Sequence, residues 1–172
     1  MNDRKEAILR SALKLFSREG YKASSTHKIA KYANVSESLI YRHYGNKKSL
    51  LQTVLKAGED KFIEIINDIL AEKDAQAFIE KTISLPFLIP AEDLDFWRLQ
   101  FKLKWESESF NTIDLDVLRP SLIKAFNKLN YEDPKLESDI LLHLINGISF
   151  SIFTDPTSNR DQLKLHLIKK YS

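Results

Sequence analysis

The chain of 172 residues contains no cysteine, and it has only 4 glycines and 5 prolines. Without cysteine it can form no disulfide, thiolate zinc site or cysteine nucleophile, and we expect a reducing, cytoplasmic location. The scarcity of glycine and proline favours helices, because sheet proteins need frequent turns. No apolar run approaches the ~18 residues of a membrane span, so no membrane partner is expected.

Charge is distributed unevenly along the chain. Residues 1–60 carry 12 basic and 6 acidic residues, a net charge of +6, whereas residues 61–172 carry 14 and 18, a net charge of −4. A basic module joined to a mildly acidic one is typical of a nucleic-acid-binding segment fused to a second domain. A solvated, lysine-rich surface would give the same count, so charge alone leaves both interpretations open.

Apolar residues in the N-terminal part recur at helical spacing. The spacing predicts a helix over 3–19, a short helix over 26–33, a tight turn at 34–36 and a third helix over 37–44. Ser36 and Asn46 are suited to cap the helices that follow them. Two short helices joined by a three-residue turn follow the helix-turn-helix plan, in which the second short helix enters the major groove.

The rest of the chain is also predicted to be helical. A long helix is expected over 47–71, followed by helices over 74–85, 91–109, 115–130, 134–153 and 159–171, with the prolines at or near their ends. The expected fold is therefore all-α. It would have an N-terminal three-helix DNA-binding domain over 1–46 and a helical effector-binding and dimerisation domain over 47–172, connected by helix 47–71.

The segment THKIAKYANVSESLIYRHYGNKKSLL, residues 26–51, resembles the DNA-binding signature of TetR-family transcriptional regulators. Ser38 stands where the family often has glycine, and Tyr44 stands where phenylalanine is commoner; Ser38 is still small enough for a close approach to DNA. The positions that carry the resemblance are Thr26, Ile29, Ala30, Ala33, Val35, Ser36, Ile40, Tyr41, Tyr44, Lys47 and Leu50.

The resemblance implies a homodimer that binds double-stranded DNA at a palindromic operator. Thr26, Tyr41 and Lys47 match positions where the family contacts phosphates, and hydroxyl and ammonium groups suit that task. Outward residues of the two short helices are expected to reach base edges. The full set of predicted DNA contacts is Thr26, His27, Lys28, Ser36, Glu37, Ser38, Tyr41, Arg42, His43 and Lys47.

Some of these residues have two interpretations. Arg42 could bond to guanine O6 and N7 or clamp a phosphate, and the sequence leaves both open. Tyr41 could instead be a core aromatic with an exposed hydroxyl. Glu37 has the wrong charge for DNA; it could accept from a cytosine amine, but capping its helix is favoured. His27 and His43 are interpreted as DNA contacts rather than metal ligands, because no cysteine lies near them.

Residues 138–153, SDILLHLINGISFSIF, are apolar nearly all round, which indicates a helix that is covered on both sides. Gly147 inside this helix suggests a close helix crossing. We expect 134–153 and 159–171 to pair with their symmetry mates as a four-helix bundle, as in the family. A core helix within the single chain is the alternative.

Large aromatic residues are frequent between residues 74 and 130. Such rings can line a pocket for a small apolar or aromatic effector, although plain core is the alternative for each one. The predicted pocket residues are Phe87, Trp97, Phe101, Trp105 and Phe126.

The predicted function is a repressor that this effector releases from its operator. The alternative is a DNA-binding regulator without a small-molecule effector, controlled by a protein partner. An enzyme is not expected, because the sequence has no glycine-rich phosphate loop and no spacing that clusters carboxylates with histidines. No metal and no cofactor is predicted.

Overall fold

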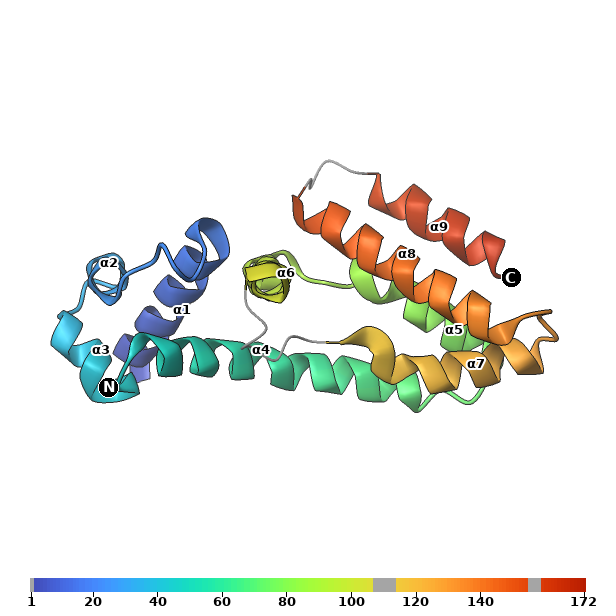
Figure 1. The fold of residues 1–172 in the computed structure, drawn as a ribbon, viewed down its shortest axis with the longest axis horizontal. Helices are drawn as coiled ribbons and strands as arrows, with labels where there is room; N and C mark the ends of the chain where they lie inside the picture. The colour runs from blue at the N-terminus through green and yellow to red at the C-terminus, as the bar shows by residue number, and fades with distance from the viewer. Residues whose placement is uncertain (1, 107–113, 155–158) are drawn as a thin grey trace. The chain divides into compact units, whose positions relative to one another are not determined.

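The computed structural model describes residues 2–106, 114–154 and 159–172. Within these ranges the chain forms helices and no strand, which confirms the all-α prediction (Figure 1). The α-helices are α1 (Asn2–Glu19), α2 (Thr26–Tyr32), α3 (Glu37–Tyr44), α4 (Lys47–Leu70), α5 (Ala75–Ser84), α6 (Leu94–Glu106), α7 (Arg119–Lys128), α8 (Pro134–Thr154) and α9 (Arg160–Lys170). Three short 3-10 helices complete the set: η1 (Leu85–Phe87), η2 (Ala91–Asp93) and η3 (Leu115–Leu118).

Two predicted helices begin with a 3-10 turn instead of α-helix. The expected helix over 91–109 is η2 followed by α6, and the expected helix over 115–130 is η3 followed by α7. Pro120 lies in the first turn of α7, where backbone N–H groups have no partner within the helix, so its missing N–H costs no helical hydrogen bond. Asp114 accepts a bond from the Asp116 N–H and so holds the start of η3.

Packing divides the chain into two compact units. Unit 1 comprises residues 1–61 and 92–113, and unit 2 comprises residues 62–91 and 114–172. Helix α4 contributes its first part to unit 1 and its last part to unit 2. The predicted boundary after residue 46 separates a DNA-binding domain from an effector-binding and dimerisation domain, and it stays a prediction.

The core of unit 1 joins all three N-terminal helices to the first part of α4. Phe16, Ile29 and Ile40 are fully buried there, with Leu50 of α4 beneath them. Helix α6 also packs against α1 and adds three buried side chains, Phe96, Leu99 and Leu103. Sequence reasoning expected α1 and the start of α4 to complete this core but did not foresee α6.

Gly58 explains how α6 approaches α4 so closely. A Cβ atom added at Gly58 would lie 2.1 Å from Cε2 of Phe96, far inside van der Waals contact. Phe96 is itself buried, so its ring has little room to move away. The absence of a side chain at Gly58 therefore permits this contact.

Unit 2 is a helical layer built around α7 and α8. Helix α7 packs along α8, and α5 contacts both α7 and α9 (Figure 1). The ring of Phe126 lies 4.8 Å from that of Tyr131 and 5.8 Å from that of Tyr171. Burial raises the pKa of Tyr171 to about 12. This aromatic cluster fixes the C-terminal end of the chain to the core.

Helix α8 is buried on one face and exposed on the other. By length and composition alone it could cross a membrane, and 39% of its apolar window is buried within the structure. The face opposite the buried one exposes Leu136, Ile140 and Phe150 by 54%, 38% and 52%. Within the described residues α8 is therefore buried on one side and exposed on the other, whereas its sequence predicts cover on both.

Candidate nucleic-acid interface

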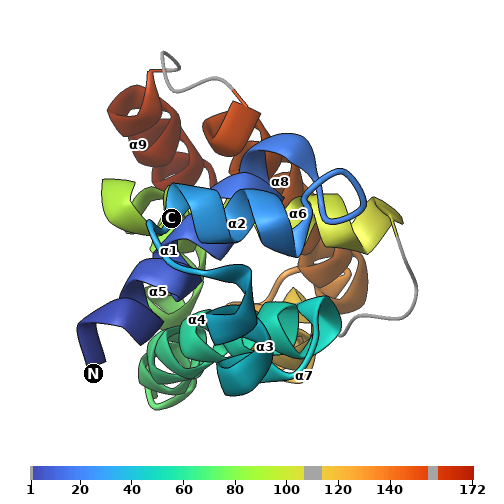
Figure 2. The ribbon, with the colours of Figure 1, turned by 90° about the vertical axis from the view of Figure 1, so that its left-hand side faces the viewer.

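Helices α2 and α3 form the predicted helix-turn-helix, and Figure 2 looks onto them. Asn34 adopts a φ of 54° in the turn, and the Val35 N–H donates to the Ala30 carbonyl over 3.0 Å. Asn46 caps α4 as predicted, since its Oδ1 accepts from the Ser49 N–H over 2.8 Å. The predicted side-chain cap at Ser36 is wrong: its hydroxyl pairs with that of Ser38 instead, over 2.9 Å.

The predicted DNA contacts differ in exposure. Tyr41 is 49% exposed, which is too much for a core aromatic. Glu37, His43 and Lys47 are half-buried, and Thr26 is buried. The exposed members of the set are His27, Lys28, Ser36, Ser38, Tyr41 and Arg42. These side chains are free to meet a ligand from solvent, which is a requirement for base and phosphate contacts alike.

Three of these residues form one hydrogen-bonded group where α2 meets α3, and a fourth, His27, lies beside it. The Thr26 hydroxyl donates to Oε1 of Glu37 over 2.6 Å, and the Tyr41 hydroxyl lies 3.2 Å from Thr26 Oγ1. Nδ1 of His27 lies 3.4 Å from Oε2 of Glu37. The Glu37 carboxylate therefore contacts Thr26 and His27 of the same chain. These contacts explain why an acidic side chain lies among the basic residues of this surface.

Lys47 and Lys28 are each held by groups of unit 1. The Lys47 ammonium lies 4.3 Å from the centre of the Tyr21 ring and 3.5 Å from the Lys22 carbonyl oxygen, and burial lowers its pKa. Lys28 forms an ion pair with Glu19, with Nζ to oxygen distances of 2.6 and 2.7 Å. Glu19 thus neutralises much of the charge that Lys28 would offer to DNA.

A basic hollow of about 490 Å³ lies beside the recognition helix. Arg4 of α1, Lys31 of α2 and Arg42 of α3 line it together with Asn34, Val35, Ser36 and Leu39. Partial burial, followed by the charges of Lys5 and Arg42, lowers the pKa of the neighbouring His43. Sequence reasoning missed Arg4 and Lys31; the excess of basic residues over 1–60 was the available signal.

Tyr44 connects α3, the predicted recognition helix, to α1. Its hydroxyl donates to the Lys5 carbonyl over 3.2 Å, and its ring packs against the core of unit 1. The orientation of α3 is therefore set by its buried Leu39 and Ile40 and by this bond to α1. A rigidly held short helix that presents Ser38, Tyr41 and Arg42 has the geometry of a groove reader.

Residues 8–54 match the profile of the bacterial regulatory proteins of the tetR family. This N-terminal segment is therefore of the tetR family. Among curated TetR-type relatives, the chain is 27% identical to the nucleoid occlusion factor SlmA of Vibrio campbellii, over 94% of this chain and 91% of that protein. It is 29% identical to the transcriptional regulator YuxN of Bacillus subtilis over 59% of this chain, an alignment that spans only 35% of YuxN.

Solved structures of transcriptional regulators share the fold along the whole chain. A regulator from Saccharomonospora viridis in complex with choline has a TM-score of 0.74 at 20% identity, covering 99% of this chain and 96% of that one. FadR from Bacillus subtilis in complex with stearoyl-CoA has a TM-score of 0.70 at 21% identity, covering 96% of each chain. At these identities the likeness concerns the fold alone.

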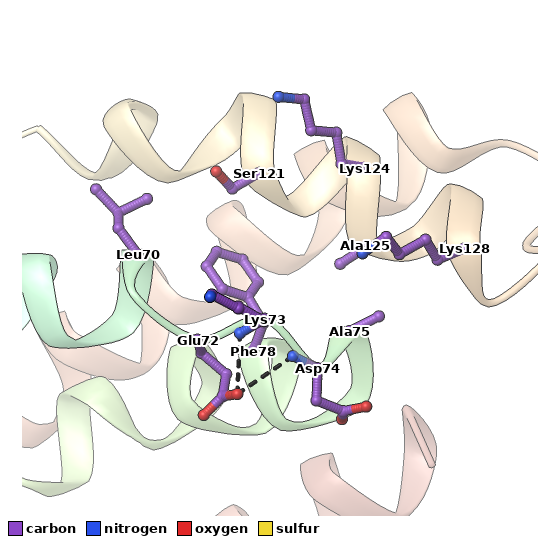
Figure 3. A pocket seen from close by; sticks show the side chains of 10 residues that line it. All are labelled: Leu70, Glu72, Lys73, Asp74, Ala75, Phe78, Ser121, Lys124, Ala125 and Lys128. Carbon is purple, nitrogen blue, oxygen red and sulfur yellow. Dashed lines mark hydrogen bonds between the residues drawn. The ribbon is translucent and has the colours of Figure 1, made fainter.

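A second candidate site lies within unit 2. It is a hollow of about 330 Å³ between the end of α4, the start of α5 and α7 (Figure 3). Figure 3 shows the Phe78 ring between Leu70 and Ala125, with Lys73, Lys124 and Lys128 around it. None of these lysines has an ion pair within the described part of the chain.

The two carboxylates at this hollow already have partners. Glu72 accepts bonds from the backbone N–H groups of Lys73 and Asp74, and its other oxygen pairs with Lys81. These contacts lower the pKa of Glu72, the Asp74 N–H bond most of all. Asp74 caps α5 through the Ala77 N–H. The hollow therefore combines an apolar floor with lysines whose charge is not compensated locally.

The predicted effector-pocket residues are distributed over both units. Trp97 and Phe101 belong to α6 in unit 1, where Trp97 packs against the core, whereas Phe87 and the fully buried Phe126 belong to unit 2. The side chain of Trp105 lies outside the described residues. The hollow of Figure 3 contains none of the five, and a pocket formed by them stays a prediction.

Proposed function

We propose that this TetR-family protein is a homodimeric repressor that binds a palindromic operator and is released from it by a small effector. The observation that carries the proposal is the exposed set Ser38, Tyr41 and Arg42 on a helix fixed to a basic unit. One such helix reaches only a few base pairs. Two of them, about 34–36 Å apart in a two-fold dimer, read a palindrome.

The exposed face of α8 supports the dimer. Leu136, Ile140, Gly147 and Phe150 recur at spacings of three, four and seven along this helix, so they share one face. An added Cβ at Gly147 would meet nothing within 4 Å in the single chain. The close helix crossing that the sequence predicts there therefore requires a second chain, and α9 adds exposed Leu163 and Leu165.

The dimer is tested by placing a charge on this face. We expect Phe150→Glu to convert the protein to a monomer and to lower operator affinity at least about a hundredfold, because a buried unpaired charge costs several kcal/mol. Val117→Glu is the matched control, because Val117 is equally exposed at 52% but lies on η3. Sedimentation equilibrium and mobility shift report the two effects. A Phe150→Glu protein that stays dimeric would refute this interface.

The effector is proposed to carry an apolar body and an acidic group. This assignment follows from the hollow of Figure 3, whose Phe78 and Leu70 suit an apolar body and whose Lys73 and Lys128 suit an anion. The related FadR structure holds stearoyl-CoA, an anion with a long acyl chain, and the S. viridis structure holds choline, a cation. The charge of the hollow favours the former kind of molecule.

Release would follow from a population shift. Leu70 lines the hollow and ends α4, the helix that begins in unit 1 at Lys47. An effector that binds better to one position of α4 favours that position, and α4 then alters the spacing of the two recognition helices. The alternative, a regulator without a small-molecule effector, assigns the same shift to a protein partner.

The experiment begins with selection of bound duplexes from a random-sequence DNA pool. We expect a palindromic consensus, and we expect stearoyl-CoA but not choline to weaken its binding in a mobility shift. A Lys73→Ala/Lys128→Ala double variant should lose the stearoyl-CoA response and keep its DNA affinity, whereas Lys56→Ala, an exposed lysine of unit 1, should keep both. No enrichment of any sequence would refute the function, and enrichment without any ligand response would favour the protein-partner alternative.

A further inference from the structure

The hydrogen-bonded group at the start of α3 has a fixed direction. Thr26 donates its only hydroxyl proton to Glu37, because an ionised carboxylate can only accept. The 3.2 Å contact between the Thr26 and Tyr41 hydroxyls must then be donated by Tyr41. Both protons are therefore directed along one chain, from Tyr41 through Thr26 to the Glu37 carboxylate.

The same carboxylate also engages His27. Nδ1 of His27 lies 3.4 Å from Oε2 of Glu37, whereas the bond from Thr26 goes to the other oxygen, Oε1. The carboxylate thus accepts from the Thr26 hydroxyl, lies beside the His27 imidazole, and is linked to Tyr41 only through Thr26. Two oxygens that accept from hydroxyl and imidazole donors are also what a DNA phosphate offers to a protein.

We propose that Glu37 is an internal substitute for a DNA phosphate: it occupies the Thr26 hydroxyl beside His27, and holds Tyr41 only through Thr26, until DNA displaces it. The inference rests on the proposed DNA-binding function. In it, Glu37 contributes to the discrimination between operator and random DNA without contacting a base. A random duplex leaves Glu37 in place and meets its negative charge. An operator that base contacts from the rest of α3 hold in register places a phosphate on the donor that Glu37 releases, so Glu37 penalises random DNA more than operator DNA.

The exposure of Glu37 fits this role. Its side chain is 36% exposed, so a phosphate can reach the carboxylate and the carboxylate can turn away into solvent. Its place at the first position of α3 leaves it stabilised by the helix dipole in either arrangement. Thr26, by contrast, is buried and stays in place as the carboxylate moves.

The test compares Glu37→Gln with Glu6→Gln, which removes the same charge from an exposed position on α1. The Glu37→Gln change keeps the size of the side chain and an acceptor oxygen but removes the charge. We expect Glu37→Gln to bind a random-sequence duplex about fivefold more tightly than Glu6→Gln does, while the two bind the selected operator within about twofold. Discrimination between operator and random DNA would therefore fall. Binding is measured by fluorescence anisotropy at several salt concentrations.

A second pair tests whether the effect runs through the Thr26 hydroxyl. In a Thr26→Val background, Glu37→Gln should gain much less for random DNA, because the hydroxyl that holds the carboxylate in place is absent. An equal gain in both backgrounds would overturn the proposal in favour of simple charge repulsion.

Other outcomes separate this proposal from the function on which it rests. If Glu37→Gln loses affinity for both duplexes and unfolds at a lower temperature, Glu37 is only a structural tie and the proposal is wrong, whereas the DNA-binding function stands. If the wild type, Glu6→Gln and Glu37→Gln bind no duplex at all, the function itself is refuted and the proposal falls with it.

Discussion

Units 1 and 2 are both helical, yet they expose opposite kinds of chemistry. Unit 1 presents hydroxyls, an arginine and lysines on helices of seven and eight residues, whereas unit 2 presents leucine, isoleucine and phenylalanine on a helix of 21. The polar, basic surface of unit 1 suits reversible binding of a polyanion, and the apolar surface of unit 2 suits a long-lived protein partner. The comparison shows that the polarity of the exposed side chains is enough to distinguish the two surfaces.

The glycines inside the two long helices carry the same contrast. Gly58 of α4 faces the Phe96 ring in unit 1, whereas Gly147 of α8 faces open space in unit 2. One glycine is explained by packing within the chain. Among the described residues, nothing packs against the other, which is why we propose a second chain there.

The largest expected effect is on Gly58. We predict that Gly58→Ala lowers the free energy of unfolding, because overpacking against Phe96 costs about 1–3 kcal/mol and outweighs the ~1 kcal/mol that alanine gains in a helix. Chemical denaturation measures the change. In a double-mutant cycle, Gly58→Ala/Phe96→Leu should be more stable than the sum of the single changes implies. Additive effects would contradict the contact.

The next effect concerns DNA affinity. We predict that Lys47→Ala weakens binding to every duplex roughly tenfold, as expected for a charged phosphate contact. The slope of log affinity against log salt should decrease in magnitude by about 0.9. Lys56→Ala, further along α4, is the control and should change neither quantity. An unchanged salt slope in a folded Lys47→Ala protein would remove Lys47 from the interface.

The third prediction concerns Gly147. Alanine there should stabilise the isolated monomer by up to about 1 kcal/mol, because nothing in the single chain opposes its methyl group. The same methyl group should weaken the dimer, which sedimentation equilibrium and melting at several protein concentrations would detect. A Gly147→Ala protein with an unchanged dimer constant would show that no helix crosses α8 at this point.

The smallest expected effect is at Tyr171. Its hydroxyl is buried with no hydrogen-bond partner among the described residues, so Tyr171→Phe should leave stability near neutral pH unchanged or slightly higher. Because the folded pKa of about 12 exceeds the ordinary value of 10.0, the wild type loses stability as pH rises from 10 to 12. Tyr171→Phe should lose less over this range, and the exposed Tyr32→Phe should behave as the wild type does. Denaturant midpoints across this pH range would show the difference.

Local patterns allowed much of the fold to be predicted. The helix over 37–44 has the observed bounds, and α2 and α4 differ from prediction by one residue each, because capping residues and turns mark their ends. The 3-10 starts of α6 and α7 were not predicted, since a 3-10 turn and an α-helix have similar apolar spacing. The packing of α6 on α1 was missed because no local signal pairs segments so far apart in the chain.

For the candidate DNA-binding site, too, the sequence predicted some residues but not the contacts between distant ones. The resemblance to the TetR signature predicted Tyr41 and Lys47 as DNA contacts, and residue chemistry predicted Arg42; these stay predictions. Glu37 was left without a role beyond a favoured cap, because its partners Thr26 and His27 lie eleven and ten residues away and meet it only across the turn.

The sequence by itself therefore determined the class of the protein, the helices and the polarity of each surface, since these depend on spacing and composition. Only the tertiary structure decided which side chains meet. It placed Phe96 against Gly58, directed the Thr26 hydroxyl to Glu37 and the Tyr41 hydroxyl to Thr26, and exposed one face of α8 in the described part of the chain. Such contacts join residues distant in the chain, and close packing fixes them through the shape of the whole unit, which no local pattern encodes.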